Sequence, residues 1–354
     1  MACAEPLRGA YLALACAPVL LAACASAPVA PYFGAAPPVL LTTIEDAGVR
    51  DLRGNYRAAT CSRLPATGPQ CDDVLLRLPG EGEAAAAAPL GGLAQRYRIA
   101  FVPGLFSECF DRYARPFEDV QRALAQEGFS VDYVRLPGRG TSVDNARHLA
   151  DHFATLPADP RPIILFAYSK GLPDTLEFIV RHPDASSGIA AIVSVAGAAN
   201  GSPLADDLNA AYQNWAATFP LPGCDAGSGE EIHDLRRDVR LEWWRKHGRA
   251  LSIPVFALVA APRPDRVSPA TRATYRQLAR IDPRNDGKLL AQDQIVPGGY
   301  LLGYANADHW AVAIPLAERL PSLSWAYRDD VPRAALVHAA IEVVAETLRA
   351  ASGR

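Results

Sequence analysis

A single serine separates a short apolar run from a helical pattern near the middle of the chain. Residues 163–168 are all apolar or aromatic, which is the composition of a strand buried on both faces. Beyond Ser169, Leu172, Leu176 and Ile179 recur with the spacing of one helix face. The stretch therefore predicts a strand, a tight turn at Ser169 and a helix, in immediate succession.

The residues two positions before and after this serine are small. Ala167 and Gly171 fit a turn so tight that its central residue takes strained backbone angles and its neighbours carry little bulk. A strand–turn–helix of this kind is the nucleophile elbow, which exposes a reactive serine. The pattern here is A-x-S-x-G rather than the commoner G-x-S-x-G. An ordinary Ser-Lys-Gly turn would look the same locally, so the rest of the chain has to decide.

Strands and helices alternate from residue 97 onward, with no internal repeat. Residues 97–354 therefore predict one α/β domain with a doubly wound, mostly parallel sheet covered on both faces. The predicted strands are 97–102, 129–136, 162–168, 189–196, 254–259 and 300–304, and the predicted helices include 115–126, 144–155 and 332–350.

The alternation lapses at about 204–250, where aromatic residues stand among charged ones. Tyr212, Trp215, Phe219, Trp243 and Trp244 lie in this insertion. One interpretation is a helical cap lined for an apolar substrate, and the other is ordinary packing on the domain. The net charge of −3 and the scattered basic residues give no support to nucleic-acid binding.

The first 23 residues have the pattern of a signal peptide, with an uncharged, mostly apolar stretch from Gly9 to Ala23. The segment Leu21-Ala22-Ala23-Cys24 resembles the bacterial lipobox. That resemblance implies cleavage before Cys24, acylation of this residue and a lipid-anchored protein of the cell envelope. Ala25 at the next position favours the outer membrane by the same resemblance. An ordinary secretory signal is the alternative. Residues 24–38 would then be an Ala/Pro tether, and residues 39–96 an N-terminal extension.

Export would leave four cysteines in an oxidising compartment. Cys61 and Cys71 close a short loop and are the favoured disulfide, which leaves Cys109 to pair with Cys224. Three pairings are possible in principle. No C-x-x-C motif or neighbouring histidine supports a metal site.

One histidine stands where a catalytic base is expected. His309 follows the strand at 300–304, whereas the other histidines lie on predicted helices or in the insertion. A serine needs such a base, and the base needs an orienting acid. In doubly wound hydrolases the chain order is serine, acid, histidine. Asp293 is the favoured acid and Asp265 the second choice. Backbone N–H groups of Leu105, after Gly104, and of Lys170 are the predicted oxyanion hole.

Together these segments resemble the α/β-hydrolase superfamily, and within it the bacterial lipases and esterases. The matching segments are 102–105, 167–171, 201–206, 293–297 and 308–310. Pro103, where many lipases have histidine, and Ala167 depart from the pattern. The resemblance implies a serine hydrolase of carboxylic esters, of lipid-like or other apolar acyl esters, with no metal or cofactor. A thioesterase or peptidase with the same triad, and a non-catalytic envelope lipoprotein, remain alternatives.

Overall fold

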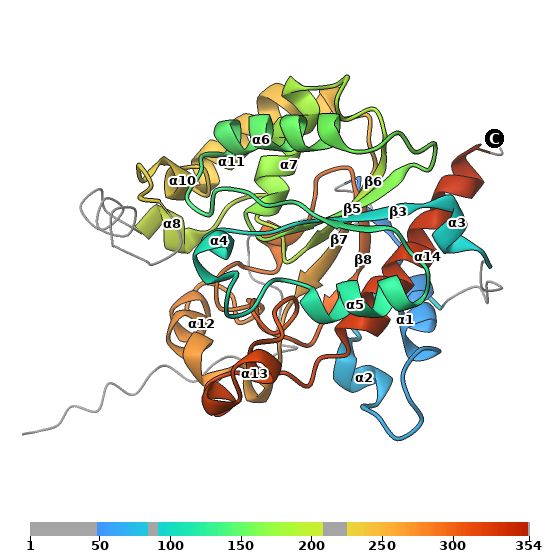
Figure 1. Ribbon diagram of the computed structural model, residues 1–354. Coiled ribbons are helices and arrows are strands. Elements are labelled where there is room, and N and C mark those ends of the chain that lie inside the picture. Colours follow the sequence, from blue (N-terminus) through green and yellow to red (C-terminus); the bar gives the residue numbers. More distant parts are fainter. Residues whose placement is uncertain (1–47, 84–90, 208–224, 353–354) are drawn as a thin grey trace, which may run out of the picture.

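Eight strands form one sheet in the computed structural model, which describes residues 48–83, 91–207 and 225–352 (Figure 1). The sheet order is β1-β8-β7-β6-β5-β3-β4, and every neighbouring pair in this order is parallel. β2 pairs with β8 in antiparallel fashion. The strands are β1 Arg50–Asp51, β2 Leu75–Leu76, β3 Arg98–Val102, β4 Val131–Tyr133, β5 Ile163–Tyr168, β6 Ile189–Val195, β7 Val255–Ala260 and β8 Tyr300–Ala305.

The central strand β5 carries the predicted serine turn at its end. All six of its residues are buried, and it lies between β3 and β6. A strand with apolar side chains on both faces needs a layer of helices on each side, because either exposed face would leave apolar surface in water. The predicted α/β class with a mostly parallel sheet is confirmed.

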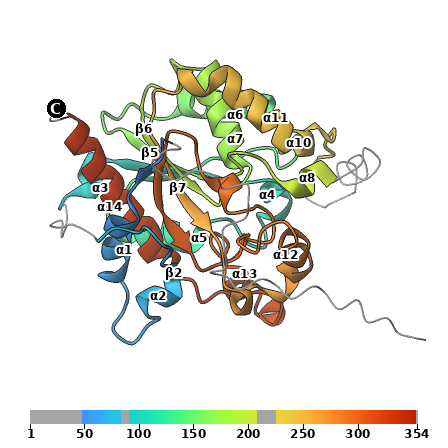
Figure 2. The ribbon, with the colours of Figure 1, turned by 180° about the vertical axis from the view of Figure 1, so that it is seen from behind.

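Helices cover both faces of the sheet (Figures 1 and 2). One face carries α6 Ser142–Thr155, α7 Gly171–Arg181 and α11 Arg237–His247, and the other carries α1 Arg53–Cys61, α5 Glu118–Gln126 and α14 Arg333–Ser352. Within the described ranges, no helix is long and apolar enough to cross a membrane.

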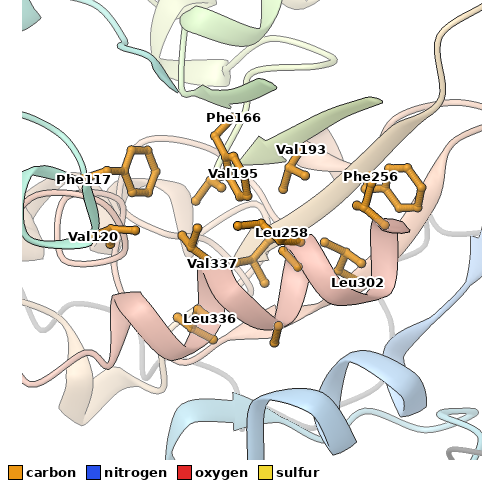
Figure 3. Packing of buried hydrophobic residues seen from close by; sticks show 14 of the residues in the cluster. Phe117, Val120, Phe166, Val193, Val195, Phe256, Leu258, Leu302, Leu336 and Val337 are labelled. Atoms are coloured by element: carbon orange, nitrogen blue, oxygen red, sulfur yellow. The ribbon is translucent and has the colours of Figure 1, made fainter. Parts of the chain in front are cut away.

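The larger hydrophobic core lies between the sheet and the layer of α5 and α14. Phe166 of β5 stacks with Phe101 of β3, and Phe101 in turn packs against Phe117. Val195, Leu258 and Val337 continue the same cluster across β6 and β7 to α14 (Figure 3). This packing holds β5 rigidly beneath the turn that follows it.

The N-terminal extension contributes directly to the sheet. β1 and β2 both pair with β8, and Tyr56 of α1 is fully buried and donates a hydrogen bond to the Leu336 carbonyl of α14 at 2.9 Å. The sheet therefore continues across the boundary expected at residue 97. These strands have two residues each, which is too short to show a period in the sequence.

The structure joins Cys61 to Cys71 by a disulfide, the pairing that their spacing favours. Cys109 is also disulfide-bonded, and its predicted partner Cys224 lies outside the described residues. The predicted signal peptide, Cys24 and the tether lie outside the described residues as well.

The region predicted as a cap includes α8 Pro203–Asp207, α10 Glu230–His233 and α11. Two of its tryptophans pack on the main domain: Trp243 donates to the Glu177 carboxylate of α7, and Trp244 donates to the Ala199 carbonyl at 2.8 Å. Their ring nitrogens anchor α11 to the domain. The other three aromatic residues named for the predicted cap are Tyr212, Trp215 and Phe219. They lie within residues 208–224, outside the described part of the chain.

Candidate active site

Ser169 occupies a strained turn between β5 and α7. Its φ of 54° lies in the left-handed region, which a residue with a side chain rarely adopts. Gly171 makes the turn possible: a Cβ there would lie 2.4 Å from the Pro103 carbonyl oxygen and 2.8 Å from that of Val102. The turn is therefore the predicted nucleophile elbow in conformation, held by the buried strands on either side.

His309 lies in the loop after β8 and faces this serine. Its Nε2 lies 2.9 Å from Ser169 Oγ. The imidazole is buried, its backbone carbonyl accepts a 2.8 Å hydrogen bond from the Tyr168 hydroxyl, and its backbone N–H donates to the Asp286 carbonyl at 2.9 Å. The base is thus held in position by main-chain bonds as well as by its ring.

The carboxylate that contacts His309 is Asp286. Its Oδ2 lies 2.6 Å from His309 Nδ1 and also accepts from Gln294 Nε2 at 3.3 Å. Its Oδ1 accepts the backbone N–H groups of Lys288 at 2.7 Å and Leu289 at 2.6 Å. The carboxylate is fully buried, so these bonds replace water. A Nδ1–H donated to Asp286 leaves Nε2 as the acceptor of the serine proton.

The structure corrects the predicted acid. Asp293, in the 3₁₀ turn Gln292–Gln294, has its Oδ2 3.4 Å from Arg237 Nε, and its carbonyl accepts from Asn200 N at 2.8 Å. Burial raises the pKa of Asp293 to about 7, and Arg237 opposes that shift only in part. Asp265 is exposed in the turn Pro264–Arg266. Neither aspartate bonds to His309 within the described residues, where Asp286 holds its Nδ1.

The error has a physical reason. The prediction placed the acid next to a strand, but the connection between β7 and β8 is long and folds back on itself. A bridge between Asn285 and Leu290 closes a turn that brings Asp286 to the histidine. The sequence signal for this turn is the pair Asp286-Gly287, which is typical of turns. In the structure Gly287 has a φ of 88°, a conformation that favours glycine.

The loop after β3 lies against the serine, as the prediction of an oxyanion hole requires. A Cβ on Gly104 would lie 2.8 Å from Ser169 Cβ, so only glycine allows this approach. No acceptor within the described residues takes up the backbone N–H of Leu105 or Lys170. Both groups remain available beside the serine.

The side chain of Lys170 points into the protein. It is 1% exposed, and its Nζ donates to Asp174 at 2.6 Å and to the Gly140 carbonyl at 2.9 Å. Asp174 also accepts from Ser142 Oγ and Asn145 Nδ2, each at 2.7 Å. These bonds tie the elbow to the start of α6.

The described ranges hold no group of three or more His, Cys, Asp or Glu side chains suited to a metal ion. The arrangement of Ser169, His309 and Asp286 is that of a serine hydrolase, in which a hydroxyl is activated by an imidazole that a carboxylate orients.

Comparison with known proteins gives the family. A metagenomic carboxyl esterase of known structure is 36% identical, with a TM-score of 0.80, and the match covers 90% of this chain and 99% of the other. Lipase 1 from Pelosinus fermentans, at 13% identity and a TM-score of 0.50, shares the fold over 71% of this chain and 98% of its own. No protein-family model and no curated protein matches the sequence. The chain belongs to the carboxyl esterases of the α/β-hydrolase fold, and it is a carboxylic ester hydrolase.

Proposed function

We propose that the protein hydrolyses esters through an acyl-enzyme on Ser169. Ser169 Oγ attacks the ester carbonyl carbon while His309 Nε2 takes the hydroxyl proton, and Asp286 stabilises the resulting imidazolium. Collapse of the tetrahedral intermediate breaks the bond to the alcohol, which leaves with the proton from His309. Water then repeats these steps to release the acid. The hydrogen-bonded chain of Ser169, His309 and Asp286 carries this proposal.

The oxyanion is assigned to the N–H groups of Leu105 and Lys170. Both lie on segments that approach Ser169, and neither has another acceptor among the described residues. Preorganised donors are worth about 3 kcal/mol each in the transition state, because they need no rearrangement as charge develops. Gly104 matters here because its lack of a side chain lets the Leu105 peptide come close.

The proposed substrate is an ester with an apolar acyl group. The expected location in the cell envelope supports this class. Residues 1–23 resemble a lipoprotein signal peptide, and a lipidated Cys24 would hold the enzyme at a membrane surface, with the outer membrane favoured. Replacement of Cys24 by Ser should then release the protein from membranes. A Cys24→Ser protein that stays membrane-bound after signal cleavage would rule out this anchor.

The test compares esters, thioesters and peptides that carry the same acyl group. The proposal predicts that esters have the highest kcat/KM and that Ser169→Ala abolishes their turnover. Preference for the thioester or the peptide would assign the same triad to a different bond. Hydrolysis that survives Ser169→Ala would place the reaction elsewhere in the protein.

A further inference from the structure

A cavity of about 710 Å³ lies beside the loop that approaches the serine. Its walls come from the ends of β3 and β4, the helix α4 Ser107–Phe110 and the segment after it, the start of α5, and α13 Leu316–Arg319. In both views of the ribbon, α4 and α13 lie toward the end of the molecule opposite the C-terminus (Figures 1 and 2). Pro103 forms part of the wall, directly before Gly104. The cavity and Ser169 therefore border the same loop after β3.

Charged side chains dominate the lining, and its acids are already bonded within the protein. Glu108 Oε2 accepts the Gly138 N–H at 2.7 Å. Glu118 pairs with Arg319 at 3.4 Å. Asp111 accepts the Tyr133 hydroxyl at 3.3 Å, and burial raises the pKa of its carboxyl. Each of these carboxylates therefore has a partner of its own within the protein.

The remaining arginines of the lining are not paired in this way. The charges of Arg115 and Arg135 partly oppose the rise in the pKa of Asp111, but neither they nor Arg112 make a side-chain hydrogen bond or an ion pair with any residue in the described ranges. The Arg115 guanidinium lies over the Tyr133 ring at 5.3 Å, which orients it without using its N–H donors. Three guanidinium groups around one cavity leave a local positive excess, although the chain as a whole carries −3.

We propose that this cavity binds an anionic group, either a phosphate or a carboxylate, such as one carried on the alcohol portion of the ester substrate. The guanidinium fork matches the geometry of these groups and offers two parallel N–H donors. The inference about the substrate rests on the proposed function of Ser169. An ester whose carbonyl reaches Ser169 would place a charged alcohol across the Pro103 wall, so the enzyme would favour amphipathic esters over neutral ones.

The first measurement uses two esters with the same short acyl chain, one of glycerol and one of glycerol phosphate, both below their aggregation limits. We expect wild type to show the lower KM for the phosphate ester. In Arg115→Gln/Arg135→Gln, its KM should rise by about tenfold or more, the loss expected for charge-assisted bonds. The neutral ester should be unaffected.

The matched control removes two positive charges elsewhere. Arg147→Gln/Arg245→Gln changes exposed side chains on α6 and α11, with the same change in net charge. It should leave both KM values unchanged. Arg112→Gln, at an exposed position, is a second variant in case the double substitution impairs folding, and it should weaken the same preference. Arg115→Lys should retain part of the preference because the positive charge remains. It should lose the rest because the two parallel N–H donors of the guanidinium are gone.

The second measurement titrates inorganic phosphate into Ser169→Ala by calorimetry, which needs no catalysis. Phosphate binding that is lost when Arg115→Gln/Arg135→Gln is added would support the site. If the phosphate ester is then not the preferred substrate, the site is assigned to a free anion. Equal KM values for the two esters, together with no phosphate binding, would overturn the proposal. A wild-type protein that binds phosphate but does not hydrolyse the esters would count against the proposed function of Ser169 and leave the anion site in place.

Discussion

The assignment of Asp286 as the orienting acid leads to a sharp prediction for Asp286→Asn. Oδ1 of Asp286 accepts two backbone N–H groups, from Lys288 and Leu289. An asparagine would keep its carbonyl oxygen there, because its NH₂ group cannot accept those bonds. The NH₂ group would then face His309 Nδ1, where the carboxylate oxygen lies 2.6 Å away in the wild type.

That arrangement would reverse the tautomer of the base. Nδ1 would have to accept a hydrogen bond, so the proton would move to Nε2, which could no longer take the proton of Ser169. Loss of the correct tautomer lowers kcat by about 10⁴-fold in the serine proteases. At about 1.4 kcal/mol for each tenfold change, this is roughly 5 kcal/mol of transition-state stabilisation.

Asp293→Asn is the matched control, since it removes one carboxylate charge from the same connection between β7 and β8 without touching His309. Steady-state hydrolysis of a p-nitrophenyl ester measures kcat for both variants, and circular dichroism checks that both are folded. We expect Asp286→Asn to be nearly inactive and Asp293→Asn to turn over like wild type. The reverse pattern would refute the geometry described above.

Three further predictions concern the elbow and the buried charges. Gly171→Ala should lower the free energy of urea unfolding by about 1–3 kcal/mol and reduce kcat, because the new Cβ would lie 2.4 Å from the Pro103 carbonyl oxygen. Gly188→Ala is the control and should change neither quantity, because a Cβ there meets nothing within 4 Å. Lys170→Met should cost about 3–5 kcal/mol of stability because it leaves Asp174 buried and unpaired, and a smaller loss in Lys170→Met/Asp174→Asn than in Lys170→Met alone would show the coupling. Burial raises the pKa of Asp293 to about 7, above its unfolded value of about 3.9, so the folded state binds more protons between these pH values and its stability falls as pH rises through them. Asp293→Asn should therefore gain stability relative to wild type from pH 5 to about 8 in thermal unfolding, and a constant difference would contradict the pKa shift.

The parts of the site that follow a local pattern were predictable from the sequence. Ser169 lies between an apolar strand and an amphipathic helix, and His309 follows a strand directly. Their positions can be predicted because the residues that indicate them are adjacent in the sequence.

The acid was not predictable in the same way. The position of Asp286 depends on how some forty residues between β7 and β8 fold back, and that connection holds four aspartates, at 265, 282, 286 and 293. Asp293 even lies in a buried turn, but it faces Arg237 of α11 rather than the histidine. The two-residue strands β1 and β2 were missed for a related reason, since their pairing with β8 is a tertiary contact with no periodic signal.

In the proposed mechanism, Ser169 is the nucleophile that carries the acyl group. Treatment with a fluorophosphonate followed by intact-mass spectrometry and peptide mapping tests it directly. We expect one adduct per chain, on Ser169, formed in step with the loss of esterase activity and absent from Ser169→Ala. An active enzyme that stays unlabelled at Ser169, or an adduct that persists in Ser169→Ala as activity disappears, would contradict it.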